Sequence, residues 1–262
     1  MDKSSLGDRM KSYENVSRTF LMPKSYVCIR VDGRAFHSWT VGLDRPFDTG
    51  LFEDMDLTAT YLCENIQNAK IGYVQSDEIT IITSNFDSYE SETFFGGNIQ
   101  KISSIVASMA TAKFNDLRKT RLNTIGIKRG PENLATFDCR CWNIPNQWEA
   151  YNTLIWRQQD AIRNSLSSVA QSLFSHKELH GKNQSMMHEM LHKKSINWAT
   201  DYTDGQKNGR LIIRETFELT ETNSDGENKQ YIPRKRWISK GAWVFTSQDS
   251  KKILQYIPDY ID

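Results

Sequence analysis

The sequence has no long apolar run, few cysteines and almost no net charge, and each of these absences excludes a class of protein. Its 262 residues contain no stretch of about 18 apolar residues, so a membrane-spanning helix is not expected. The first twenty residues lack the apolar centre of a secretory signal, which favours a cytoplasmic protein. None of the four cysteines has the CxxC spacing of a zinc site. Cys28 and Cys63 lie in apolar patterns, which predicts reduced and buried thiols.

The net charge of +1 hides an uneven distribution of charged residues. Residues 31–92 hold twelve Asp or Glu against three Lys or Arg, whereas residues 113–130 hold six basic residues against one acid. Residues 229–240 hold five basic residues and no acid. This segregation predicts an acidic, cation-binding centre with basic rims for a polyanion. For either basic run alone, a solvated charged face is the simpler interpretation.

Apolar periodicity in the first half predicts the order strand, helix, strand, strand, helix, strand. The expected segments are 26–31, 49–67, 71–75, 79–83, 98–117 and 135–142. This order predicts an α+β, ferredoxin-like fold in which two helices cover one face of an antiparallel sheet. In that topology the first strand lies beside the strand that leaves the central hairpin, so the end of strand 26–31 meets the hairpin turn.

The second half has a different pattern. We expect a long helix at 147–175 and a shorter helix at 184–194. A β-hairpin is expected to follow, with strands at 209–219 and 229–239 and a polar tip at 222–228. No repeat or low-complexity linker separates the halves. We therefore predict a catalytic domain over residues 1–145 and an extension over 146–262 that packs on it and contributes to RNA binding and oligomerisation.

Two acidic turns follow apolar strands, Asp32-Gly33 in one and Ser76-Asp77-Glu78 in the other. The predicted topology brings these turns to one edge of the sheet. Converging carboxylates form a hard-oxygen site that suits Mg²⁺, and two such ions about 4 Å apart assist phosphoryl transfer. The expected ligand is a nucleoside triphosphate. Either turn alone reads as an ordinary turn, and Glu78 is either a ligand or a residue that holds the turn.

Gly33 lacks a Cβ atom, so its backbone can approach a metal or a phosphate closely. We expect exposed amides from Arg34 to His37 to surround a triphosphate. Four basic residues are candidate phosphate partners by charge, namely Arg45, Lys101, Lys128 and Arg129.

Residues 188–192 form an HExxH pentapeptide on an expected helix. Two histidines at this spacing can bind zinc, with Glu189 as the base of a metalloprotease. No histidine follows His192, although a later glutamate remains available as third ligand. The simpler interpretation is a polar helix face, with His176 and His180 near RNA.

Trp237 lies next to a basic run that includes Arg234, Lys235 and Arg236. Such a strip predicts base stacking and phosphate contacts with RNA. An exposed basic edge strand that discourages aggregation explains the same residues, and both interpretations remain open.

Four motifs together resemble one family. DGRAFH at 32–37, QSDE at 75–78, FDCRCWNIPN at 137–146 and WRQQDAIRNS at 156–165 are similar to the motifs of the tRNA-histidine guanylyltransferase superfamily. The resemblance runs from about residue 6 to about residue 215. It implies a polymerase palm domain that works in the 3′-to-5′ direction and adds nucleotides to the 5′ end of a tRNA. It also suggests a homotetramer built as a dimer of dimers.

The resemblance implies roles for individual residues. Asp32 and Asp77 would bind two Mg²⁺ ions with the carbonyl of Gly33, and Glu78 would complete the catalytic set. The nucleotide, GTP, ATP or another nucleoside triphosphate, would lie along Ser76 and residues 32–37, which include Arg34, Ala35, Phe36 and His37. A 5′-monophosphate end would first be activated by ATP, and the 3′-hydroxyl of the incoming nucleotide would then attack it.

Departures from the family pattern bear on the substrate. The His-Ile-Asn-Asn segment of the eukaryotic guanylyltransferases proper reads Ile-Arg-Asn-Ser at 162–165, so Asn164 alone matches. We predict that Arg163 and Asn164 contact RNA. The segment SHKELHGK at 175–182 resembles bacterial and archaeal members that repair shortened tRNA 5′ ends. We therefore predict template-dependent repair of truncated tRNA. Alternatives are addition of a single G to histidine tRNA, a palm-type nucleotide cyclase, and a non-catalytic RNA-binding protein.

Overall fold

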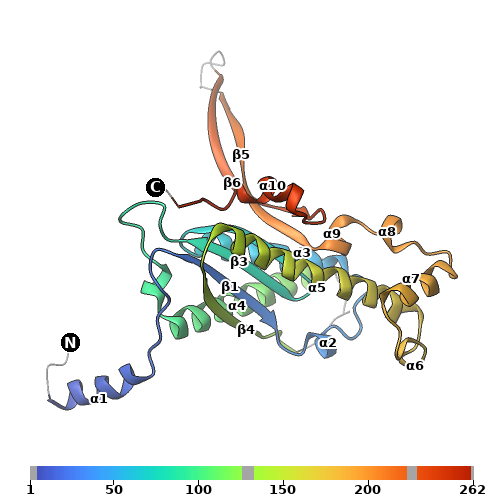
Figure 1. Cartoon of the computed structure of the whole chain (residues 1–262), viewed down its shortest axis with the longest axis horizontal. Coiled ribbons are helices and arrows are strands. Elements are labelled where there is room, and N and C mark those ends of the chain that lie inside the picture. The colour runs from blue at the N-terminus through green and yellow to red at the C-terminus, as the bar shows by residue number, and fades with distance from the viewer. Residues whose placement is uncertain (1–4, 126–132, 223–228, 261–262) are drawn as a thin grey trace.

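The protein is built around one antiparallel sheet with helices on both faces (Figure 1). The structure, a computed structural model, describes residues 5–125, 133–222 and 229–260. In sheet order the strands are β4 (Phe137–Ile144), β1 (Tyr26–Gly33), β3 (Glu78–Ser84), β2 (Ala69–Gln75), β5 (Arg210–Thr222) and β6 (Lys229–Gly241). The expected α+β class is confirmed.

Three long helices cover the sheet, with α5 (Gln147–Leu173) on one face and α3 (Thr49–Asn65) and α4 (Ile99–Ile125) on the other. The shorter helical segments are α1 (Ser5–Val16), α2 (Phe36–Trp39), η1 (Phe94–Gly97), α6 (His176–Leu179), α7 (Gln184–His192), α8 (Trp198–Asp201), α9 (Asp204–Asn208), η2 (Ser247–Asp249) and α10 (Ser250–Leu254). No helix of the described residues is long and apolar enough to cross a membrane.

Burial on both faces explains the apolar run of β1. Side chains alternate between faces along a strand. Val27, Ile29 and Val31 pack with the core beneath α3 and α4, whereas Tyr26 and Cys28 pack beneath α5. Cys28 is buried with a free thiol, as the sequence predicted.

Asp48 caps the start of α3, where its side chain accepts a 2.6 Å hydrogen bond from the backbone N–H of Leu51. Some elements are longer than expected, since α4 continues to residue 125 and β6 reaches Gly241. The β5–β6 hairpin projects from the body in Figure 1, and most of its predicted tip, from residue 223, lies outside the described residues.

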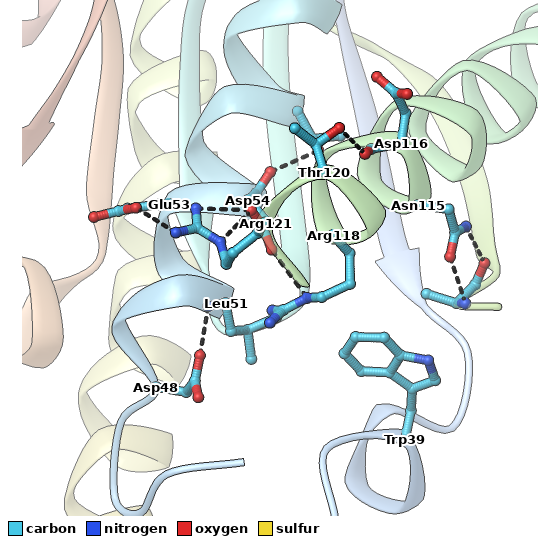
Figure 2. Close-up of polar contacts among 12 residues, drawn as sticks. Trp39, Asp48, Leu51, Glu53, Asp54, Asn115, Asp116, Arg118, Thr120 and Arg121 are labelled. Atoms are coloured by element: carbon cyan, nitrogen blue, oxygen red, sulfur yellow. Dashed lines mark hydrogen bonds and ion pairs between the residues drawn. The ribbon is translucent and has the colours of Figure 1, made fainter. Parts of the chain in front are cut away.

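A buried ion cluster joins α3 to α4 (Figure 2). The carboxylate of Asp54 is 1% exposed, and Arg118 Nε lies 2.9 Å from its Oδ2 atom. Arg121 Nη2 lies 2.8 Å from the other oxygen, and Nη1 of the same residue lies 2.8 Å from the exposed Glu53. Because charges of both signs are removed from water here, loss of one partner leaves the other charge uncompensated.

Asp54→Ala is expected to lower the free energy of unfolding by about 3–5 kcal/mol, because it leaves the buried Arg118 without its carboxylate partner between α3 and α4. Glu53→Ala is the matched control, since Glu53 is 57% exposed and binds the same Arg121. That change is expected to cost less than about 1 kcal/mol. Urea denaturation followed by circular dichroism measures both, and equal losses would contradict a special role for Asp54.

Candidate active site

The two acidic turns meet at one edge of the sheet. In the antiparallel pairing of β1 with β3, Asp32 lies opposite Glu78. The backbone N–H of Gly33 donates a 3.1 Å hydrogen bond to the carbonyl oxygen of Asp77. The strand order predicted this convergence, and the structure shows it.

Asp77 occupies an electrostatically unfavourable position between these turns. The pKa of its carboxyl group is raised to about 6, chiefly by burial and less by the charges of Asp32 and Glu78, while a hydrogen bond from Ser76 opposes the shift. Within the described residues, neither Asp32 nor Asp77 forms an ion pair with a basic side chain. Two carboxylates of like charge without a protein cation form a set of oxygen donors that suits Mg²⁺.

Glu78 differs from the other two acids because it has a cationic partner. Arg157 of α5 donates from Nε to one oxygen of Glu78 at 2.7 Å and from Nη2 to the other at 2.6 Å. Both side chains are buried, and Nη1 of Arg157 also reaches Asp160 at 2.6 Å. Both oxygens of Glu78 are therefore engaged, so a cation at this edge has two free carboxylates and requires further oxygen ligands from backbone, water or phosphate. The sequence reasoning missed Arg157, although the WRQQD motif contained it.

Gly33 is required for packing as well as for close approach. A Cβ atom at this position would lie 2.3 Å from the ring of Phe36, which is buried against Trp39, Phe114 and Phe137. From the sequence we predicted only that glycine lets the backbone come close to a ligand at this position.

Two non-glycine residues beside the acidic turns have left-handed backbone conformations, Ala35 with φ 54° and Ser76 with φ 47°. A positive φ angle is uncommon in residues other than glycine, and non-glycine residues that have one cluster at functional sites.

One expected backbone donor is already used. The N–H of Arg34 donates to the carbonyl of Thr136 at 2.8 Å, so the prediction that this amide is available was wrong. In the described part of the chain, the N–H groups of Ala35, Phe36 and His37 have no hydrogen-bond acceptor. Because the Phe36 side chain belongs to the core, this residue can reach a ligand only through its backbone.

A cavity beside the acidic turns brings together residues that are far apart in the sequence. Arg45, Ser76 and Asn164 line it together with Gln75, Ser165 and Arg210. Arg45 and Ser76 were predicted to bind a nucleotide, whereas Asn164 was predicted to contact RNA. The structure therefore places Asn164 with the predicted nucleotide residues. Arg210 was missed, and its position on β5 next to β2 has no local sequence signal.

Other predicted contacts lie away from this cavity. Lys101 is exposed in the first turn of α4, with its Nζ atom 4.8 Å from the ring centroid of Phe95. Arg163 is exposed on α5 and forms an ion pair with Asp160. Lys128 and Arg129 lie outside the described residues.

The basic strip on β6 is only partly available. Arg234 and Arg236 are exposed, but Trp237 is 9% exposed and packs in the core, with Arg214 5.4 Å from its ring centroid. The prediction that Trp237 offers a stacking surface was therefore wrong for the folded chain, because strand alternation points this side chain toward α3.

The HExxH pentapeptide lies on α7 as predicted, but the described residues supply no zinc site. No group of three His, Cys, Asp or Glu side chains in this part of the chain is arranged to hold a metal. His188 packs edge-on against Trp198, with ring centroids 5.6 Å apart.

Comparison with known proteins identifies similar chains. The family model described as tRNAHis guanylyltransferase matches residues 7–145. The uncharacterized protein R259 of Acanthamoeba polyphaga mimivirus is 30% identical over 81% of this chain and 78% of its own, and a tRNA(His) guanylyltransferase of Schizosaccharomyces pombe is 26% identical over 80% of each. A bacterial tRNA(His) guanylyltransferase-like protein, solved in complex with ATP, superposes with a TM-score of 0.82 and 39% identity, covering 97% of this chain and 99% of that one.

Asp77→Asn is expected to stabilise the metal-free protein at pH 7.5. Because the folded-state pKa of Asp77, about 6, lies above its usual value of 3.8, wild-type stability falls as pH rises through this interval. The variant removes that loss, so it should exceed the wild type by about 1–3 kcal/mol at pH 7.5 in EDTA and match it near pH 4.

Thermal unfolding at both pH values measures this difference. Asp138→Asn, an exposed carboxylate opposite Asp32 on β4, is the control and should change stability by less than about 0.5 kcal/mol. Addition of Mg²⁺ should stabilise the wild type and not Asp77→Asn. A variant that is less stable than the wild type at pH 7.5 would contradict the assigned electrostatics.

Proposed function

This chain belongs to the tRNAHis guanylyltransferase family of nucleotidyltransferases, and from that premise we propose that it is a template-dependent 3′–5′ polymerase that repairs truncated tRNA 5′ ends. The observation that carries this proposal is the pair of free carboxylates, Asp32 and Asp77, beside a cavity lined by Arg45 and Ser76. The 39% identity to a bacterial guanylyltransferase-like protein over nearly the whole chain supports the repair subgroup.

We assign the polymerase palm to the first half of the chain. The sheet order β4-β1-β3-β2, with α3 and α4 on one face, has the arrangement of a ferredoxin-like domain. Residues 1–145 would form this catalytic domain and residues 146–262 an extension packed on it. In this assignment the candidate metal site lies at the edge of the palm where β1 ends.

The donor set fits Mg²⁺, with Asp32, Asp77 and the carbonyl of Gly33 as the residues that would hold it. Bound Mg²⁺ would neutralise triphosphate charge and favour attack by a hydroxyl group. Residues of the chain would bind and orient the nucleotide. Arg45 and the hydroxyl of Ser76 would hold the nucleotide, and the free amides of Phe36 and His37 would donate to phosphate oxygens. Arg157 keeps the charge of Glu78 paired, so that repulsion at Asp77 is limited.

The proposed reaction has two nucleotidyl transfers. A 5′-monophosphate end attacks the α-phosphate of ATP, releases pyrophosphate and gains an adenylyl group. The 3′-hydroxyl of the incoming nucleoside triphosphate then attacks the activated 5′ phosphate and displaces AMP. A 5′-triphosphate end omits the first step and releases pyrophosphate in the second. Base pairing with the opposite acceptor strand selects the nucleotide.

A second candidate activity is addition of a single G to histidine tRNA. It is favoured by the name of the family model and by the S. pombe relative, a tRNA(His) guanylyltransferase. The replacement of the family's His-Ile-Asn-Asn by Ile-Arg-Asn-Ser at 162–165 argues for repair instead. A homotetramer in the cytoplasm is part of the proposal, and light scattering on the purified protein tests the tetramer.

The deciding assay offers two substrates, a tRNA that lacks its first nucleotide and an intact histidine tRNA, each with nucleoside triphosphates and Mg²⁺. We expect templated extension of the truncated tRNA. Preference for the intact histidine tRNA would replace repair by the second activity. Product formed from nucleoside triphosphates without RNA would indicate a cyclase instead, and absence of Mg²⁺-dependent pyrophosphate release would indicate a non-catalytic RNA-binding protein.

Asp32→Asn and Asp77→Asn should each lower the rate of nucleotide addition by more than about 100-fold, because the metal that offsets triphosphate charge is lost. Asp116→Asn, on the exposed face of α4, is the control and should retain the wild-type rate. Retention of activity in either site variant would refute the metal assignment.

Arg234→Ala and Arg236→Ala should weaken tRNA binding and lower its dependence on salt concentration by about one unit of log–log slope each, because each arginine is expected to contact a phosphate. Lys251→Ala, an exposed cation on α10, is the control. Fluorescence anisotropy at several salt concentrations measures these slopes. Unchanged binding would indicate that the basic residues of β6 only protect an exposed edge strand from aggregation.

A further inference from the structure

Two tryptophans and an arginine form a stack beside the acidic turns. Arg30 precedes Asp32 by two residues on β1, so both side chains lie on the face of the sheet covered by α5. The guanidinium carbon of Arg30 is 5.7 Å from the ring centroid of Trp142 on β4 and 5.5 Å from that of Trp156 on α5. We call Arg30, Trp142 and Trp156 the indole stack.

Arg30 is the charged member of the stack and has no polar partner in the described part of the chain. Its Nε atom is buried and donates no hydrogen bond there, and no carboxylate of the described residues lies within ion-pair distance. Three other arginines of β4 and α5 have ion-pair partners. They are Arg140 with Asp138, Arg157 with Glu78, and Arg163 with Asp160. The stack therefore carries a cation without an ion-pair partner, and two aromatic rings lie beside its guanidinium group.

Trp156 is fixed in position and yet open to solvent. Its ring centroid lies 4.4 Å from the guanidinium carbon of Arg157, which is anchored by two hydrogen bonds to the buried Glu78. Trp156 is nevertheless 47% exposed. Cations beside an indole restrict its motion and polarise its π-face. Trp156 is thus an exposed indole whose neighbour Arg157 binds Glu78 of the acidic turn, and it has the features of a stacking surface for a base.

The chemistry of the surface around Trp156 favours RNA over protein as the ligand. A protein contact would need a wider apolar patch, whereas this surface offers one open indole among charged groups. A nucleotide supplies both partners that are missing, a flat base for Trp156 and an anionic phosphate for the unpaired Arg30. The end of a base-paired acceptor stem exposes one face of its terminal base, which single-stranded recognition surfaces commonly cover with an aromatic ring.

We propose that Trp156 is the stacking platform for the terminal base at the 5′ end of the RNA, and that Arg30 and Trp142 hold the platform beside Asp32. This rests on the proposed function in one respect, namely that the ligand is an RNA whose 5′ end is extended. Arg157 contacts both Trp156 and Glu78, so it fixes the position of the platform relative to the carboxylates.

The test uses full-length protein and a truncated tRNA that carries 2-aminopurine as its 5′-terminal base. Stacking on an indole quenches this fluorophore, so wild-type protein should quench it, and an internal 2-aminopurine three nucleotides away should not respond. Trp156→Ala should abolish the quench and raise the KM for tRNA by about 5- to 100-fold, the effect expected for loss of one stacked base. The KM for the nucleoside triphosphate should remain within about twofold, and Trp156→Phe should restore most of the tRNA affinity.

Trp148→Ala is the matched control, because Trp148 is 56% exposed on the same helix and has no cation beside its ring among the described residues. It should keep the quench and the wild-type KM. A wild-type protein that fails to quench the terminal probe overturns the proposal whether or not any variant folds. So does a Trp156→Ala variant, folded by circular dichroism, that quenches normally. Failure of nucleotide addition together with a Trp156-dependent quench would instead refute the proposed function and leave the platform standing.

Discussion

The ion pair between Arg157 and Glu78 supports the whole candidate site. Three carboxylates at two adjoining turns repel one another, and burial makes their charges more costly. Arg157 enters from α5 and neutralises one of them through two hydrogen bonds, which leaves Asp32 and Asp77 as the uncompensated pair. Because a buried ion pair adds little net stability when compared with apolar packing, its contribution here is geometric. It fixes α5 over the turn that the metal and the nucleotide would share.

Residues from both halves of the chain line one cavity, so the predicted boundary near residue 145 does not divide the candidate site. Arg45 and Ser76 come from the first half, and Asn164 and Arg210 come from the second, yet all four line one cavity. Phe47, close to Arg45, packs edge-on against Tyr202, with ring centroids 5.5 Å apart. The small core around α7 and α8 therefore supports the loop that carries Arg45.

Sequence reasoning succeeded where a local pattern implies a long-range arrangement. The apolar runs set the strands, the strand order placed strand one beside the hairpin, and Asp32 and Asp77 then had to meet. It failed where a polar residue meets another element, because helical periodicity identifies the buried face and not the partners of polar side chains. Arg157 and Asn164 of α5 are of this kind. The helices α6, α8 and α9 have four or five residues, too few to show a period.

The hairpin of β5 and β6 is continuous with the sheet that carries the site. Leu211 and Arg210 of β5 pair with Tyr73 and Val74 of β2, and the same strand runs outward from the body while paired with β6. β2 ends at Gln75, one residue before Ser76. Backbone hydrogen bonds therefore connect the outer part of the hairpin to the strand that leads into Ser76. A force applied to the hairpin would reach the candidate site through this backbone ladder, without passing through side-chain contacts.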